Sequence, residues 1–170
     1  MFQPGDIIVY GNTGVCKVVE LSRPNLPGVD QKKDYYLLFP LFQDEKIYSP
    51  VDNTKVFMRP VIGRKQAEEL IDMIPHVQAK KIQSCGNQQL REQYQEYFKT
   101  HNCADLLELI MSIYAKKQQQ FGSRHKIGQI DERYMKKAEE LLYGELAVAL
   151  EITPKDVPSY IAKRMREIEE

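Results

Sequence analysis

Hydrophobic residues in the first sixty positions form short runs that are separated by turn-forming residues. The runs occupy residues 7–10, 15–21, 34–41, 46–49 and 55–59. Clusters rich in Pro, Gly, Asn and Asp lie between them, for example at 23–28 and 51–53. Short runs with such boundaries are typical of β-strands. Five strands in so few residues predict a closed or nearly closed barrel, because closure removes exposed sheet edges.

The third run is hydrophobic at every position from Tyr35 to Phe39. A half-buried strand alternates hydrophobic and polar residues, whereas a strand that is covered on both faces does not. This run is therefore predicted to be the central strand of the sheet.

Beyond residue 60 the hydrophobic residues recur at helical spacing. Ala67, Leu70, Ile71 and Ile74 share one face of a helix that is predicted to lie between residues 64 and 75. Four more amphipathic helices are predicted at 87–101, 102–122, 131–150 and 153–168. Each has one apolar stripe, so the five helices are predicted to pack together as a bundle.

Several residues are predicted to mark helix ends. Asn102, followed by Asp105 three residues later, is typical of a helix start, and Gly122 is typical of a helix end. Asp131 and Thr153 are the predicted N-caps of the last two helices.

The change of pattern near residue 60 predicts an α+β multidomain chain. Residues 1–60 are expected to form an SH3/Tudor-like small β-barrel, and residues 64–170 an all-α helical bundle. Pro60 cannot donate a ladder hydrogen bond and Gly63 is conformationally permissive, so the boundary is placed at these two residues.

The composition is that expected of a reduced, cytoplasmic protein. Of the 170 residues, 42% are hydrophobic and 28% are charged. No apolar run approaches the roughly 20 residues that a membrane span requires, so we expect no membrane association. The three cysteines have no CxxC spacing, which argues against a disulfide framework. The formal net charge is zero, which counts against a strongly basic DNA-binding protein.

The opening of the chain carries the most specific motif. Its residues are Phe2-x-x-Gly5-Asp6-x-x-Val9-Tyr10-x-x-x-Gly14-Val15. Three later segments, 48–53, 58–61 and 143–150, follow it at characteristic spacing. Together these elements resemble the CarD/CdnL family of bacterial RNA polymerase-binding transcription regulators. The N-terminal domain of that family is shared with the transcription-repair coupling factor.

The resemblance implies a transcription regulator with two contacts. Its barrel would bind the RNA polymerase β subunit, and its helical domain would meet promoter DNA upstream of the bubble and modulate the stability of the open complex. A small barrel can offer an edge strand to a strand of its partner. The polymerase-binding candidates are Arg23, Ile47, Tyr48 and Ser49. Alternatively, Ile47 and Tyr48 simply alternate between the inside and the outside of the barrel.

Two stretches of the helical part lack acidic residues and supply candidates for contacts with DNA. Their positive field is locally uncancelled, which attracts phosphates. The candidates are Lys80, Lys81, Asn87, Gln88 and Arg91, and a second cluster of Lys116, Lys117, Arg124 and Lys126. Family members usually carry a tryptophan at the start of the second bundle helix, but this chain has none. Binding to promoter DNA is therefore predicted to be weak and largely non-specific, since no tryptophan can wedge into a base step.

No motif in the sequence indicates an enzyme. The chain has no nucleotide-binding loop, and the pair His101-x-Cys103 matches no common zinc spacing. No catalytic residue, metal, cofactor or small-molecule substrate is predicted. Tyr94, Tyr97 and Phe98 could stack on unpaired bases, but their helical spacing favours core packing.

A second interpretation belongs to a different functional class. An SH3-like adaptor, or an RNA- or ribosome-associated module whose helical domain binds protein only, would also be neutral and lack the tryptophan. Recovery of polymerase subunits by residues 1–60 would favour the first interpretation, and recovery of ribosomal proteins the second.

Overall fold

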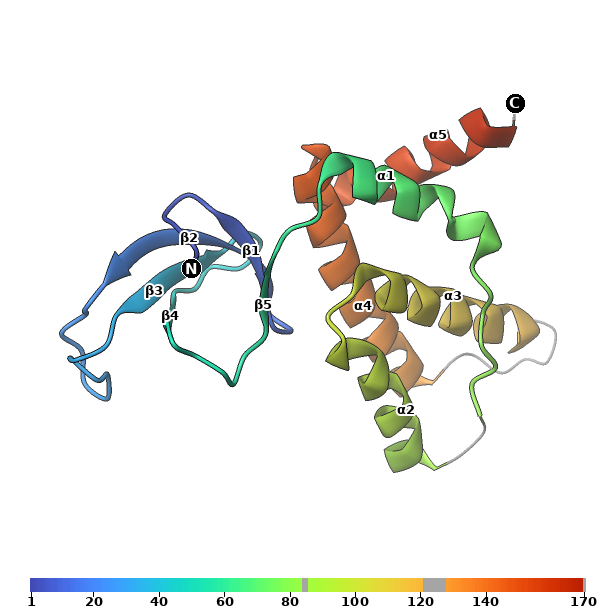
Figure 1. The fold of residues 1–170 in the computed structure, drawn as a ribbon. Helices are drawn as coiled ribbons and strands as arrows, with labels where there is room; N and C mark the ends of the chain where they lie inside the picture. Colours follow the sequence, from blue (N-terminus) through green and yellow to red (C-terminus); the bar gives the residue numbers. More distant parts are fainter. Residues whose placement is uncertain (84–85, 121–127, 170) are drawn as a thin grey trace. The chain divides into compact units, whose positions relative to one another are not determined.

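The computed structural model describes residues 1–83, 86–120 and 128–169. The chain divides into two compact units, Met1–Val61 and Ile62–Glu170 (Figure 1). The first unit is built of strands and the second of helices, so the α+β class is confirmed.

The first unit contains one five-stranded antiparallel sheet. Its strands are β1 Ile7–Tyr10, β2 Gly14–Ser22, β3 Tyr35–Pro40, β4 Ile47–Pro50 and β5 Met58–Pro60. They lie in the order β4-β3-β2-β1-β5. Among the described residues β4 pairs with β3 alone and β5 with β1 alone, so the sheet is open and the expected closed barrel is not formed. Closure would require the two outer strands to pair, and these are short, at four and three residues.

The core of the sheet unit lies on one face of the sheet. Ile8, Cys16, Val18, Tyr36 and Leu38 form its buried centre. The continuous hydrophobic run from Tyr35 to Phe39 lies in β3. The first four residues of β3 are all buried, as expected for a strand with neighbours on both sides. The middle of the sheet is β2, however, so the prediction of a central position for β3 was wrong.

Gly11 shapes the turn between β1 and β2. Its φ is +46°, in the region that favours glycine, and its N–H donates to the Phe57 carbonyl at 2.8 Å. A Cβ atom at this position would lie 2.9 Å from Val56 Cγ1. The turn and the segment before β5 are therefore packed too closely for a side chain.

The described part of the second unit contains five α-helices. They are α1 Arg64–Asp72, α2 Asn87–Lys99, α3 Cys103–Gln120, α4 Gln129–Leu150 and α5 Val157–Glu169. Two 3-10 turns, at Ile74–His76 and Pro154–Asp156, follow α1 and precede α5. No helix in the described ranges is long and apolar enough to cross a membrane.

Two predicted helix starts turned out differently. Asn102 caps α3, since its side chain accepts the Ala104 N–H at 2.9 Å. Asp131 does not cap α4, because the helix begins two residues earlier, after Gly128. Its carboxylate instead accepts the Gly128 N–H at 3.1 Å from inside the first turn. The predicted end at Gly122 lies outside the described residues.

The helical core gathers around α4. Tyr94 and Phe98 of α2 are buried in this core, so the structure supports core packing for these two aromatic residues. Tyr97 is half-buried beside them.

Two buried carboxylates accept hydrogen bonds within this core. Asp131 is 2% exposed and accepts hydrogen bonds from the Tyr94 hydroxyl and from Lys116 Nζ, the latter at 2.9 Å. Glu145 is 3% exposed and accepts the Ile62 N–H at 3.0 Å.

Candidate functional site

Strand β4 presents a free edge whose hydrogen-bonding groups can be assigned. The Val51 N–H donates to the Asp34 carbonyl at 3.0 Å, and the register continues without a shift to the pair Leu38–Ile47. Hydrogen-bonded and non-hydrogen-bonded pairs alternate along an antiparallel ladder. Ser49 therefore bonds toward β3, whereas the N–H and C=O of Tyr48 point away from the sheet.

The next outward-facing position on this edge is Pro50, which has no N–H. Tyr48 is therefore the sole outward N–H donor within β4. An edge with one donor resists unspecific pairing with other strands, yet can still bond to a partner of matching register.

The side chains of β4 alternate as one of the two interpretations predicted. Ile47 is half-buried against the sheet core, and Ser49 is 1% exposed. The Ser49 hydroxyl accepts a hydrogen bond from the Asn53 amide at 3.2 Å. Tyr48 points to the other face and is 36% exposed. Of these three candidates, Tyr48 is the one whose side chain and backbone are both accessible.

Arg23 lies just beyond the end of β2. Ser22 pairs with Tyr35, which pairs with Pro50, so Arg23 is at the end of the sheet where β4 finishes. Its Nε donates to Asp34 at 2.7 Å, and this hydrogen bond raises the pKa of the guanidinium. Both side chains are more than half exposed. The ion pair fixes the direction of Arg23 while leaving it accessible.

Two of the basic candidates in the helical unit are already paired with carboxylates. Lys80 Nζ lies 3.0 Å from Glu108, and the hydrogen bond raises the pKa of the lysine. Lys116 lies 2.9 Å from Asp131, and its side chain is 23% exposed. Lys116 is thus part of the helical core rather than of an exposed basic surface.

The remaining candidates are exposed or half-buried, or lie outside the described residues. Lys81, Asn87 and Gln88 are exposed, and Arg91 is half-buried. The first turn of α2 contains no acidic residue, so the positive end of the helix dipole is not neutralised there. Lys117, on α3, is exposed and acts electrostatically on Glu139. Arg124 and Lys126 lie outside the described residues.

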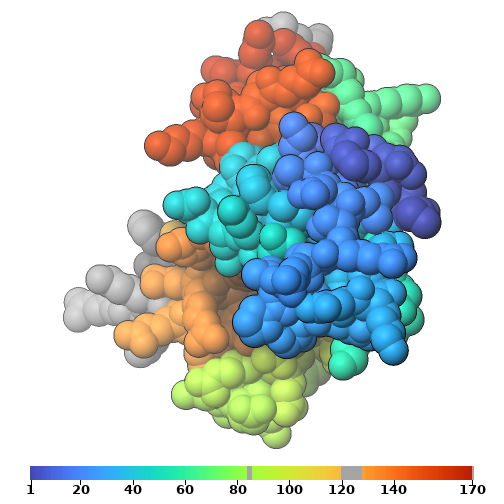
Figure 2. Space-filling model, turned by 90° about the vertical axis from the view of Figure 1, so that its left-hand side faces the viewer, coloured from blue at the N-terminus to red at the C-terminus, as the bar shows by residue number. Residues whose placement is uncertain are grey.

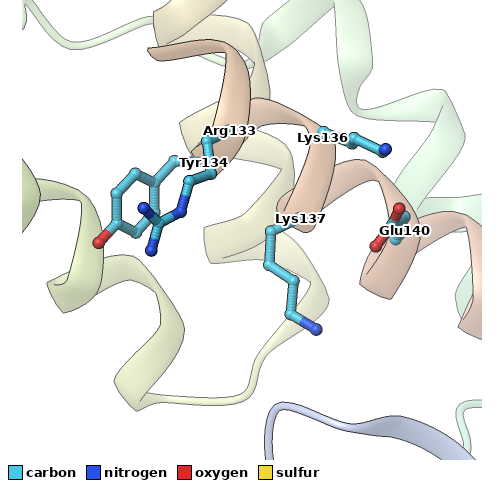
Figure 3. A pocket seen from close by; sticks show the side chains of 5 residues that line it. All are labelled: Arg133, Tyr134, Lys136, Lys137 and Glu140. Atoms are coloured by element: carbon cyan, nitrogen blue, oxygen red, sulfur yellow. The ribbon is translucent and has the colours of Figure 1, made fainter. Parts of the chain in front are cut away.

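A basic surface on α4 was missed by the sequence analysis. Arg133, Lys136 and Lys137 project along one side of this helix, with Glu140 beside them (Figure 3). The guanidinium of Arg133 lies 5.9 Å from the centre of the Tyr134 ring. The start of α4 (orange) and the start of α2 (yellow-green) both reach the surface in Figure 2.

The signal for this basic surface was present as helical spacing. Residues three and four apart share a helix face, so Arg133, Lys136 and Lys137 are neighbours although acidic residues interrupt the sequence around them. They do not stand out as an acid-free stretch, because acidic residues precede and follow them closely, and their common face shows only in the helical period.

The helical unit also contains an apolar hollow of ≈ 160 Å³. It is lined by residues of α1, α3, α4 and α5, which include Leu70, Met111, Tyr143 and Ile161. The lining of this hollow would suit an apolar group rather than a phosphate.

The cysteines of the described residues are buried and reduced. Within the described residues neither Cys16 nor Cys103 forms a disulfide bond. Burial, helped by the charge of Glu45, raises the pKa of Cys16 to about 12, so this thiol is poorly reactive. Within the described ranges no three His, Cys, Asp or Glu side chains come together as metal ligands would.

A small open sheet with an exposed edge strand can add a strand of a partner protein, which is the arrangement expected of a protein-interaction module. Residues 2–62 match the family model of the CarD-like/TRCF RID domain. The N-terminal unit of this chain therefore belongs to that domain family, which supports a transcription-related role that involves RNA polymerase. No curated protein is significantly similar to the chain.

Proposed function

We propose that this protein is a transcription regulator that binds the β subunit of RNA polymerase through the edge strand β4. The observation that carries the proposal is the outward direction of the Tyr48 N–H and C=O in a domain of the CarD-like/TRCF RID family. We further assign the sheet unit to the SH3/Tudor-like folds, with its barrel left open between β4 and β5.

The binding step is the addition of one strand. A strand of the β subunit pairs with β4, so that Tyr48 donates one main-chain hydrogen bond and accepts another. Arg23, held by Asp34 at the end of the sheet where β4 finishes, then meets an acidic or carbonyl group of the partner. Main-chain bonds supply affinity, and the side chains of Tyr48 and Arg23 supply specificity.

Substitution of Tyr48 tests this step. Tyr48→Pro removes the outward donor and is expected to abolish binding of the full chain to purified RNA polymerase. Tyr48→Thr is the matched control, because it removes the aromatic ring but keeps the N–H and a strand-favouring side chain. A folded Tyr48→Pro variant that binds as well as the unmodified protein would refute edge pairing.

We propose that the helical unit makes weak contacts with the phosphates of promoter DNA. The available cations are Lys81 and Arg91 near the start of α2, Lys117 on α3, and Arg133, Lys136 and Lys137 on α4. Phosphate contacts carry no sequence information, so the polymerase must position the helical unit at the promoter. The effect on open-complex stability comes from this positioning, since no tryptophan wedges into the bubble.

The salt dependence of DNA binding tests this contact. Three or four phosphate contacts give a log–log slope of about −3 to −4 in fluorescence anisotropy, and Lys137→Gln is expected to reduce its magnitude by about 1. Lys155→Gln, on an exposed position far along the chain, is the control. Salt-insensitive binding, or a strong preference for a pre-melted duplex, would contradict purely electrostatic contact.

Two observations favour the adaptor interpretation. Lys80 and Lys116 are paired with carboxylates, and the hollow beside Leu70 and Met111 is apolar. If DNA is not bound even in the presence of polymerase, the helical unit binds protein only. In either case we propose a binding protein rather than an enzyme.

A further inference from the structure

The turn that joins β3 to β4 carries an exposed aromatic residue. Phe42 is 51% exposed, and its neighbour Leu41 is 37% exposed. Turn positions usually hold Gly, Asn, Asp or Ser, because these residues tolerate the backbone and the contact with water. Two consecutive apolar residues at a turn therefore require an explanation beyond folding.

The backbone at the start of this turn is hydrogen-bonded to β2. The Leu41 N–H donates to the Val15 carbonyl at 3.0 Å, which extends the contact between β3 and β2 beyond Pro40. The aromatic residue before the turn, Phe39, is half-buried, and Lys46 Nζ lies 5.8 Å from the centre of its ring. Phe42 thus directly follows a residue whose backbone is hydrogen-bonded to β2, which lowers the entropy lost when it binds.

Phe42 lies in line with the edge that is proposed to bind the polymerase. Leu38 pairs with Ile47, so the hairpin runs from this pair toward its turn, where Phe42 is found. At its opposite end, β4 finishes beside the pair of Arg23 and Asp34. A strand that pairs with β4 and continues past Ile47 reaches the turn that holds Phe42.

We propose that Phe42 is the apolar anchor of the polymerase contact and enters a pocket next to the strand that pairs with β4. This inference rests on the proposed function and names the residue that adds specificity to it. The occupant of the surface is the polymerase, because the unit that carries Phe42 is a CarD-like/TRCF RID domain and Phe42 is continuous with its free edge. Aromatic residues are enriched at the centres of such interfaces.

The test compares three substitutions in the full chain by titration with purified RNA polymerase. Phe42→Ser is expected to weaken binding by about tenfold or more, as truncation of an interface anchor does. Phe42→Tyr keeps the ring and is expected to bind within about threefold of the unmodified protein. Phe57→Ser is the matched control, since Phe57 is 45% exposed and precedes the opposite edge strand, β5.

The result can be separated from that of the proposed function. Loss of binding in Tyr48→Pro together with unchanged binding in Phe42→Ser would overturn the anchor and leave edge pairing intact. An equal loss in Phe42→Ser and Phe57→Ser would overturn it as well, because the effect would then be unspecific. A selective loss in Phe42→Ser, with an unchanged melting temperature, would support the anchor.

Discussion

The two units use their polar groups in opposite ways. In the sheet unit, the N–H and C=O of Tyr48 face outward from an edge strand, and Arg23 is held in an exposed ion pair. In the helical unit, the carboxylates of Asp131 and Glu145 are buried and accept several hydrogen bonds from the protein. Polar groups left open at an edge create a binding surface, whereas polar groups closed within a core fix the packing of helices.

Within the helical unit, the same distinction between buried and exposed polar groups separates the basic residues. Lys116 belongs to an acid-free stretch of sequence, but its charge is neutralised by the buried carboxylate of Asp131. Arg133, Lys136 and Lys137 lie among acidic residues in the sequence, but they reach the surface together. The position of the charged partner, rather than the local sequence, decides which cation can meet a phosphate.

The largest expected effect is that of Lys116→Met. It leaves the carboxylate of Asp131 buried without its cation, which costs about 3 kcal/mol of unfolding free energy. The loss should appear in urea denaturation of the helical unit and leave the sheet unit unchanged. Lys117→Met, one residue along the same helix, is exposed and should cost less than about 0.5 kcal/mol. Similar losses in both variants would mean that Asp131 does not depend on Lys116.

Glu145→Ala is expected to have the next largest effect. It removes the acceptor of the Ile62 N–H and also a hydrogen bond from Cys103 Sγ at 3.0 Å. The expected loss is about 2 kcal/mol in thermal or urea unfolding, because the partly buried Ile62 N–H and the buried Cys103 thiol both lose their acceptor. Glu145→Gln should lose less, since its amide oxygen can still accept the Ile62 N–H. If the two variants are equally destabilised, the carboxylate charge matters more than this hydrogen bond.

Gly11→Ala tests the stability of the sheet unit. The expected loss is about 1–2 kcal/mol, because alanine disfavours a φ of +46° and its Cβ would meet Val56. Gly28→Ala is the comparison, since Gly28 also has a positive φ but no atom within 4 Å of the added Cβ. A smaller loss for Gly28→Ala isolates the cost of the close contact, and an equal loss would assign the whole effect to the backbone.

The smallest effect is expected for the pair of Asp72 and Arg164 at the surface of the helical unit. Arg164 Nε donates to Asp72 at 2.6 Å, and this hydrogen bond lowers the pKa of the carboxyl. A lowered pKa adds stability above the usual carboxyl range, and that stability is lost as the pH falls through the lowered value.

Asp72→Asn should therefore cost less than about 1 kcal/mol at neutral pH, since the pair is solvated. The difference between the variant and the unmodified protein should shrink in acid. An NMR titration that finds the Asp72 carboxyl at or above its usual pKa would contradict this account.

Local sequence patterns predicted most of the helices and strands. They failed where contacts between residues distant in the sequence determine the structure. β1 was predicted at its observed bounds, and the Asn102 cap was confirmed. The start of α4 was misplaced because Asp131 is drawn into the core by Tyr94, 37 residues away. The barrel that was predicted to be closed or nearly closed is not closed, because strand number alone does not determine whether the outer strands meet. The edge strand was predicted from the sequence, but the sequence did not show which of its residues point their N–H and C=O away from the sheet.

The sequence by itself determined the strand and helix segments, the change of class near residue 60 and the motif of the N-terminal domain. These depend on spacing and turn chemistry within a few residues, which the sequence states directly. The tertiary structure alone decided that Tyr48 faces outward, that Lys116 is neutralised and that Glu145 holds Ile62 from 83 residues away. Each of these depends on a partner brought near by folding, and burial then makes its charge or hydrogen bond matter.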